Sequence, residues 1–213
     1  MTKLILVRHG ESEANCQKRF AGHFNAKLQD RGLEQAKITA QYIVNHYQVD
    51  AVYASDLIRA YETGKCVSDL LELPIIADRN LREIHAGEWE GIFFDDLEKL
   101  YAEDFGRWQR DIGNSRCTGG ESVKQLGERI MGVLTRIAQE NPDRTVVIAT
   151  HATPIRVMQC LISRQSLDEM KDIPWVSNAS LTEILYENGT WSLGRVGLDE
   201  YLTEYRTTLA PNV

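Results

Sequence analysis

Apolar residues along the chain fall into two kinds of pattern. Short apolar runs rich in β-branched residues predict buried strands at 4–7, 51–54 and 145–150, with 74–77 as a weaker fourth. Longer segments between these runs carry apolar residues three and four positions apart, which is the pattern of amphipathic helices. Strands that alternate with helices are typical of a parallel sheet covered by helices on both faces.

Four helices are expected in these longer segments. Asp30 is placed to cap the first, and Ser55 or Asp56 to cap the second. The third stops before Asn141-Pro142-Asp143, and the fourth follows Pro154. The expected helical spans are 30–47, 55–71, 123–137 and 154–162.

The last strands differ from the others because they are joined by a tight turn. Residues 181–186 and 191–196 flank Asn188-Gly189, a pair typical of two-residue hairpins. The sequence therefore predicts an α/β fold with three layers, α/β/α. Its central sheet is mainly parallel with an antiparallel edge strand, in one domain over 1–213. Residues 89–120, rich in Trp, Phe, Asp and Glu, are expected to form an excursion that covers a pocket.

Composition narrows the functional classes. Among 213 residues, 43% are hydrophobic and 26% charged, and the net charge of −7 disfavours a nucleic-acid partner. No apolar run is long enough for a membrane span or a secretory signal. The four cysteines lack the spacing of a metal site or a disulfide framework, so we expect a cytoplasmic location. The pattern Asn178-Ala179-Ser180 matches a glycosylation acceptor, but we do not expect it to be glycosylated there.

Basic residues stand directly after three of the expected strands. The first run continues into Arg8-His9-Gly10, the second leads to Arg59, and the third ends before His151. Ligands of open α/β sheets bind beyond the carboxyl ends of the strands. We therefore expect two arginines and two histidines to converge at one edge of the sheet.

This set of residue types suits a phosphate group. Guanidinium groups offer paired donors to phosphate oxygens, and two of them disfavour the protonated form of a neighbouring imidazole. His9 can then attack phosphorus and form a phosphohistidine. A proton donor for the leaving oxygen is also needed, and spacing alone leaves Glu83, His85 and Glu88 as alternatives.

The combined motifs resemble the histidine phosphatase, or phosphoglycerate-mutase-like, superfamily. The similar stretches lie in the family's order at 6–15, 55–63, 81–91, 119–122 and 149–151. The resemblance implies that His9 is the phosphorylated nucleophile and Glu83 the general acid/base, with Arg8, Arg59 and His151 completing the phosphate pocket. It also implies contacts from Asn15, Ala21 and Gly22, a small phosphorylated metabolite as partner, and no metal or organic cofactor.

Departures from the family pattern concern the substrate more than the chemistry. Ala21, Asn25 and Lys27 stand where Gln, Asp and Pro are usual, and Ala152, a further expected substrate contact, replaces a common glycine. The expected pocket also takes in part of the excursion through Trp89, Phe93, Phe94, Phe105 and Trp108.

Two other functions remain open beside a phosphatase of small monoesters. A phosphoglycerate-type mutase is disfavoured because the segment between Glu83 and His151 is short and has no Arg-Arg pair. A non-catalytic phospho-ligand binder is disfavoured because binding alone needs no proton donor.

The remaining histidines and the assembly are less informative. His23, His46 and His85 are expected to be ordinary hydrogen-bonded residues of loops or the core. A metal centre built on His9 and His151 is disfavoured because the flanking arginines repel cations. The sequence leaves a homodimer open.

Overall fold

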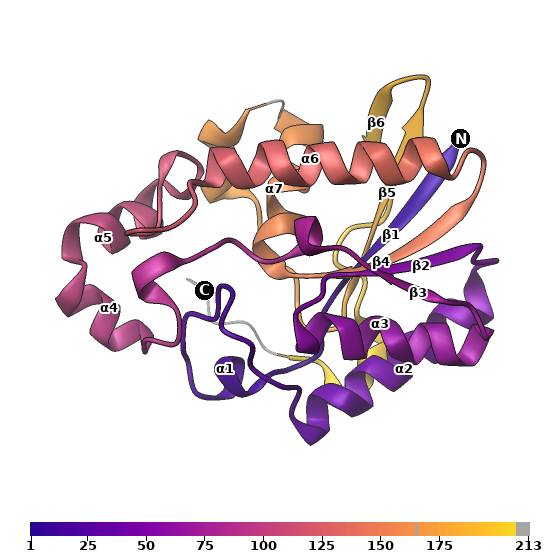
Figure 1. Cartoon of the computed structure of the whole chain (residues 1–213), viewed down its shortest axis with the longest axis horizontal. Coiled ribbons are helices and arrows are strands. Elements are labelled where there is room, and N and C mark those ends of the chain that lie inside the picture. Colours follow the sequence, from indigo (N-terminus) through magenta and orange to yellow (C-terminus); the bar gives the residue numbers. More distant parts are fainter. Residues whose placement is uncertain (165, 208–213) are drawn as a thin grey trace.

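A six-stranded sheet forms the centre of the molecule (Figure 1). The computed structural model describes residues 1–164 and 166–207. Within them the strand order is β3-β2-β4-β1-β5-β6. The first four strands of this order are parallel, whereas β5 and β6 are antiparallel to their neighbours, as predicted for the hairpin. The strands are β1 (Thr2–Arg8), β2 (Ala51–Ala54), β3 (Ile75–Ala77), β4 (Thr145–Thr150), β5 (Leu181–Glu187) and β6 (Thr190–Leu193).

Alternate residues of the central strands enter different cores. Leu4 and Leu6 of β1 join one apolar cluster, while Ile5 and Val7 join another on the opposite face. Side chains of a strand alternate between the two faces of its sheet, so an unbroken apolar run is required where both faces are covered. This explains why the run before Arg8 has no polar interruption.

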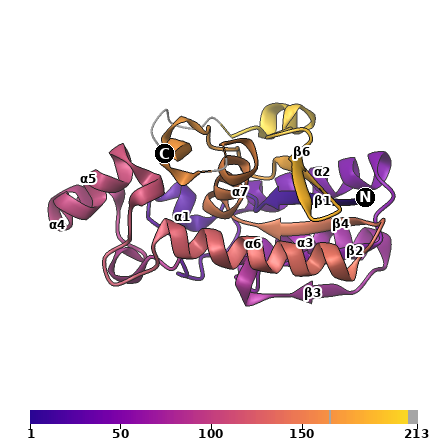
Figure 2. The same cartoon turned by 90° about the horizontal axis from the view of Figure 1, so that it is seen from above.

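Helices cover both faces and complete the predicted three layers (Figures 1 and 2). Helices α2 (Asp30–His46) and α3 (Ile58–Leu71) contribute to the core beside Ile5 and Val7. Helices α6 (Val123–Glu140) and α7 (Ala152–Arg164) contribute to the larger core on the other face.

The caps of α2 and α3 and the starts of α3 and α7 differ from the sequence predictions, whereas α2 and α6 begin where predicted. Asp30 is the first residue of α2 rather than its cap, and the cap positions of α2 and α3 are Gln29 and Leu57, without side-chain capping bonds. Helix α7 begins at Ala152, two residues before Pro154. Proline is tolerated in a first turn because its missing N–H has no partner to lose there.

The hairpin turn has the backbone that its sequence demands. Asn188 and Gly189 both have positive φ, 50° and 81°, as a type I′ turn requires. Strand β6 ends at Leu193, earlier than the predicted 196.

None of the described helices is long and apolar enough to cross a membrane.

The excursion extends beyond the carboxyl ends of the parallel strands (Figure 1). Its backbone joins the loop before α2 through hydrogen bonds from Phe20 N to Ile92 O and from Phe94 N to Lys18 O. That it covers a pocket stays a prediction. Its helices are η2 (Gly87–Trp89), α4 (Phe94–Leu100), α5 (Ala102–Arg110) and η3 (Ile112–Asn114), and the other short helices are α1 (Glu13–Cys16), η1 (Arg79–Leu81), η4 (Leu167–Asp172) and η5 (Glu200–Tyr205).

Candidate active site

Strand register brings the two histidines together. Arg8 of β1 lies opposite Thr150 of β4, so His9 and His151 leave the sheet side by side at the same level. The His9 N–H donates to Thr150 O at 3.0 Å. The two imidazole rings meet edge to face with their centroids 5.2 Å apart. The predicted convergence therefore follows directly from parallel pairing of adjacent strands.

His9 is held as a neutral ring whose Nε2 carries the lone pair and accepts one hydrogen bond. Its Nδ1 donates to the Gly10 carbonyl at 2.7 Å, which leaves Nε2 as the acceptor. Arg59 Nε donates to this Nε2 at 3.2 Å. Burial, followed by the charges of Arg59 and Arg8, lowers the pKa of His9 well below its usual range. The arginines thus act as expected, but burial contributes more to the shift.

Arg59 connects the nucleophile to the loop at 21–26. The side chain is fully buried in the first turn of α3 and donates to Phe24 O at 3.0 Å and Gly22 O at 2.8 Å. Burial lowers its pKa to about 10, so the guanidinium stays charged at neutral pH. Gly22 has a φ of 49°, and a β-carbon there would lie 2.6 Å from that of Ala86. Only glycine fits this turn beside Arg59.

Arg8 and His151 each present one unsatisfied buried nitrogen. Arg8 donates through one terminal nitrogen to Val176 O, while its Nε has no partner. His151 Nε2 lies 2.8 Å from Ser55 Oγ, and its Nδ1 has no partner either. Burial lowers the pKa of Arg8 to about 10, and burial and the Arg59 charge lower that of His151 well below its usual value. The cluster is therefore buried, positively charged and incompletely hydrogen-bonded.

Glu83 is the one buried side chain of the three proton-donor candidates. It is 8% exposed, and its carboxylate accepts from Ile84 N at 2.9 Å and from Thr153 N, in the first turn of α7, at 3.4 Å. Its charge raises the pKa values of Arg8 and Arg59. His85 and Glu88 are exposed. Burial therefore distinguishes Glu83 from His85 and Glu88, which their spacing in the sequence did not.

The expected substrate contacts differ in how much of each side chain is free. Asn15 Oδ1 is engaged by Ser12, whose N–H and hydroxyl donate to it at 3.0 and 2.8 Å, so the amide NH₂ is the group left for a ligand. Ala152 is 8% exposed at the start of α7, directly after His151. Ala21 O accepts from Phe24 N at 2.8 Å within the turn.

Sequence reasoning missed the residues that hold the site's backbone. Asn178 is 1% exposed and donates to His9 O at 3.1 Å and Asn15 Oδ1 at 3.3 Å. Ala179 N donates to Arg8 O at 3.0 Å. The acceptor pattern at Asn178 gave no signal for this role, because the contact with His9 depends on β5 pairing with β1. Ser55, considered only as a helix cap, instead contacts His151 and accepts from Leu57 N at 3.3 Å.

Three of the excursion aromatics pack against one another. Trp89, Phe105 and Trp108 are at most 9% exposed. Phe20 lies between Trp89 and Trp108 at centroid distances of 5.4 and 5.3 Å. Phe93 is exposed, with the Arg19 guanidinium 3.9 Å from its ring centroid. Edge-to-face packing of Trp89, Phe105 and Trp108 stabilises the base of the excursion, and a contact of these side chains with the substrate stays a prediction.

Comparisons with known proteins identify the family of this chain. Residues 4–199 match the family model described as histidine phosphatase superfamily (branch 1). Phosphoserine phosphatase 1 of Hydrogenobacter thermophilus is 35% identical over 162 residues, 76% of each chain. Phosphoglycerate mutase-like protein 4 of Arabidopsis thaliana is 28% identical over 205 residues, 95% of this chain and 87% of the relative.

A solved structure shares the whole architecture. Bacillus stearothermophilus YhfR superposes with a TM-score of 0.90 at 26% identity, covering 95% of this chain and 100% of that one. Together with the strand-end pair of His9 and His151, the family match confirms the resemblance found in the motifs. The chain belongs to the histidine phosphatase superfamily, branch 1.

Proposed function

We propose that this protein hydrolyses small phosphate monoesters through a phosphohistidine on His9 Nε2, with Glu83 as general acid and base. A phosphatase related to this chain at 35% identity supports the class of reaction. The proposal goes further than the family match, because it assigns the intermediate, the residues and the class of substrate.

The observation that carries the proposal is the pair of unsatisfied nitrogens beside His9. Buried polar groups in folded proteins nearly always have partners, so each exception calls for an explanation. Arg8 Nε and His151 Nδ1 are two of only four such side-chain atoms in the described residues. Oxygens of a bound phosphoryl group would satisfy both at once, next to the lone pair of His9.

Ser55 prepares His151 for this contact. Its Oγ accepts from Leu57 N, which leaves the hydroxyl proton free to be donated to His151 Nε2. His151 then carries its own proton on Nδ1, the unsatisfied atom. A neutral His151 in this tautomer donates one hydrogen bond to a phosphoryl oxygen.

The first step transfers the phosphoryl group. The lone pair of His9 Nε2 attacks phosphorus, and the bond from phosphorus to the ester oxygen breaks. The bound phosphate dianion repels a negative charge on Glu83 and so favours its protonated form. This form gives its proton to that oxygen, so an alcohol leaves and Glu83 becomes a carboxylate. Arg8 and Arg59 stabilise the charge on the transferring oxygens.

The second step regenerates the enzyme. The Glu83 carboxylate takes a proton from water as the water oxygen attacks phosphorus, and the bond from phosphorus to His9 Nε2 breaks. Inorganic phosphate leaves, and Glu83 is again protonated. The same residue thus serves in opposite roles in the two steps, and neither step calls for a metal ion.

The direct test is a panel of sugar phosphates, phosphoserine, phosphoglycerates and nucleotides, with release of phosphate as the readout. His9→Ala is expected to lower kcat/KM by on the order of a thousandfold or more, because the nucleophile is removed. The wild-type enzyme should form a covalent phosphoryl adduct that is labile in acid and stable in base, and this variant should form none. Turnover retained by His9→Ala would overturn the assignment.

A mutase is the second candidate because one relative is named phosphoglycerate mutase-like. Interconversion of phosphoglycerates at a rate equal to their hydrolysis would favour it. A phospho-ligand binder is contradicted by any turnover that depends on His9.

A further inference from the structure

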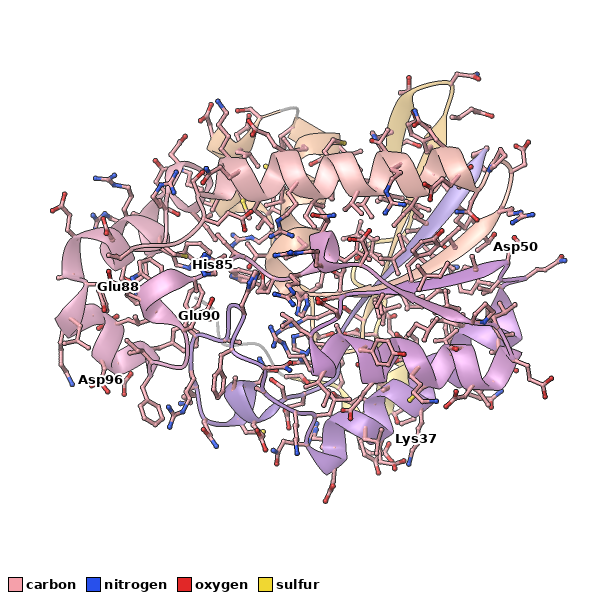
Figure 3. The ribbon with its side chains drawn as sticks, viewed as in Figure 1. Lys37, Asp50, His85, Glu88, Glu90 and Asp96 are labelled. Atoms are coloured by element: carbon pink, nitrogen blue, oxygen red, sulfur yellow. The ribbon has the colours of Figure 1, made fainter. Side chains whose placement is uncertain are left out.

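A second group of chemically competent side chains lies beside the candidate active site and takes no part in the proposed reaction. His23 belongs to the loop that holds Arg59, while His85 and Glu90 follow Glu83 along the chain. Their potential ligand atoms all lie within 4.8 Å of one another. Figure 3 shows His85 and Glu90 close together at the base of the excursion.

His23 is oriented as a metal-binding histidine usually is. Its Nε2 donates to the Glu83 carbonyl at 2.9 Å, which leaves the Nδ1 lone pair available. A ligating imidazole almost always donates its other N–H to a carbonyl or carboxylate, which fixes both the tautomer and the ring.

Glu90 is also held in place before any ligand binds. Its Oε1 accepts from His23 N at 3.0 Å and from Ala86 N at 3.1 Å, while no hydrogen bond within the described residues is recorded for Oε2. His85 Nε2 lies 3.8 Å from Glu90 Oε1 on a side chain that is 51% exposed. Ligand atoms of a tetrahedral zinc site stand about 3.4 Å apart. The three candidate atoms, all within 4.8 Å of one another, therefore have to close by about 1.4 Å at most, and the exposed side chain of His85 is free to supply this movement.

Nearby arginines do not forbid a cation at this position, because two of the three are already paired. Arg82 forms two hydrogen bonds with Asp56, and Arg129 forms two with Glu121. The third, Arg59, is directed toward His9 and the carbonyls of Gly22 and Phe24. The carboxylate of Glu90, as one of the three ligands, also offsets part of the charge of a divalent cation.

We propose that His23, His85 and Glu90 bind one divalent transition-metal ion of the zinc class. Two imidazoles and a carboxylate are a donor set that zinc accepts, and the exposed side of His85 leaves a fourth position for water. The ion would join the loop at 21–26 to the segment at 83–91. Both segments frame the phosphate site, through Gly22 O on Arg59 and through Glu83.

The experiment is a titration of the full chain with Co²⁺, followed by visible absorbance, and with Zn²⁺ in competition with a chromophoric chelator. One ion per chain is expected, with the absorbance of nitrogen and oxygen ligands and no thiolate charge-transfer band. His85→Ala should weaken binding by about tenfold or more, since a ligand is lost. His46→Ala, at an exposed histidine on α2, and Cys16→Ser should both leave affinity unchanged.

Two conservative variants separate ligation from folding. Glu90→Gln keeps an oxygen for His23 N and Ala86 N but loses the charge, and His23→Gln keeps a donor for the Glu83 carbonyl but loses Nδ1. Each should weaken metal binding by about tenfold or more while the melting temperature of the metal-free protein changes little. Absence of saturable binding, or affinity equal to wild type in His85→Ala, would overturn the site. The titration does not depend on turnover, and His9→Ala should bind the ion as the wild type does.

Discussion

Two charged clusters in this molecule, one fully buried and one with a half-exposed arginine, are built in opposite ways. We define the open cluster as Arg8, His9, Arg59 and His151, and the closed cluster as Tyr47, Glu183 and Arg195. In the closed cluster, Glu183 accepts from Tyr47 Oη at 2.8 Å and from Arg195 at 3.0 Å, and Arg195 also donates to Tyr47 at 2.7 Å. In the open cluster the cations lie together, and two nitrogens lack partners.

The pKa shifts of the two clusters express the same difference. Burial lowers the pKa of Arg8 to about 10, which means that the fold disfavours its charge. Burial alone would raise the pKa of Glu183, but hydrogen bonds from Arg195 and Tyr47 outweigh it and lower the pKa to about 2. The closed cluster therefore stabilises the fold, while the open cluster costs stability and keeps hydrogen-bonding capacity for a ligand.

After His9→Ala, the largest effect on activity is expected from Glu83→Gln, which tests the proton transfer that accompanies chemistry at the open cluster. An amide holds the shape of the carboxyl group but neither donates nor takes a proton, so kcat should fall by on the order of a thousandfold. Affinity for inorganic phosphate should stay close to that of the wild type. Wild-type kcat in this variant would move the acid/base role to His85 or Glu88.

Arg8→Met tests whether the open cluster trades stability for activity. Replacing a poorly paired buried charge by an apolar side chain of similar length should raise the free energy of unfolding by about 1 kcal/mol. The loss of one phosphate ligand should lower kcat/KM by about a hundredfold. Urea unfolding and phosphatase assays measure the two effects, and a clear loss of stability would contradict the comparison.

Glu183→Gln is the matched change in the closed cluster. Weaker hydrogen bonds to Tyr47 and Arg195 should lower the free energy of unfolding by about 1.5 kcal/mol. Activity should stay within about twofold of the wild type, because Glu183 pairs with Ile5 in the sheet, well before Arg8. A large loss of kcat here, with stability unchanged, would reverse the roles of the two clusters.

The smallest expected effect is a change with acid pH in the stability difference between the wild type and Glu183→Gln. The pKa of Glu183 falls from its ordinary 4.5 to about 2 on folding, so its contribution to stability is complete above 4.5 and is lost as the pH falls toward 2. The difference in unfolding free energy between wild type and Glu183→Gln should therefore shrink across that window. A difference that stays constant from pH 6 down to about 2 would show that the carboxylate charge is not responsible.

Much of the fold was predictable because strand and helix periods are local properties of the sequence. The run from Leu4 to Val7 had to be covered on both faces, and the run at 145–150 predicted a second buried strand of the same kind. The antiparallel hairpin followed from Asn188-Gly189, whose backbone has few alternatives. Helix starts were less predictable, because a polar residue near a start caps only if the backbone turns to meet it.

The amino-acid sequence by itself determined the four charged or imidazole residues of the open cluster, since Arg8, His9 and His151 end expected strands and Arg59 opens an expected helix. Tertiary structure alone decided which proton-donor candidate is buried, that Asn178 and Ser55 support the histidines, and that Trp89 and Trp108 of the excursion pack against Phe20. It also decided that His23 meets His85 and Glu90. The reason is that periodicity is read within one segment, whereas contacts between segments depend on strand order and register, which are set by the whole chain.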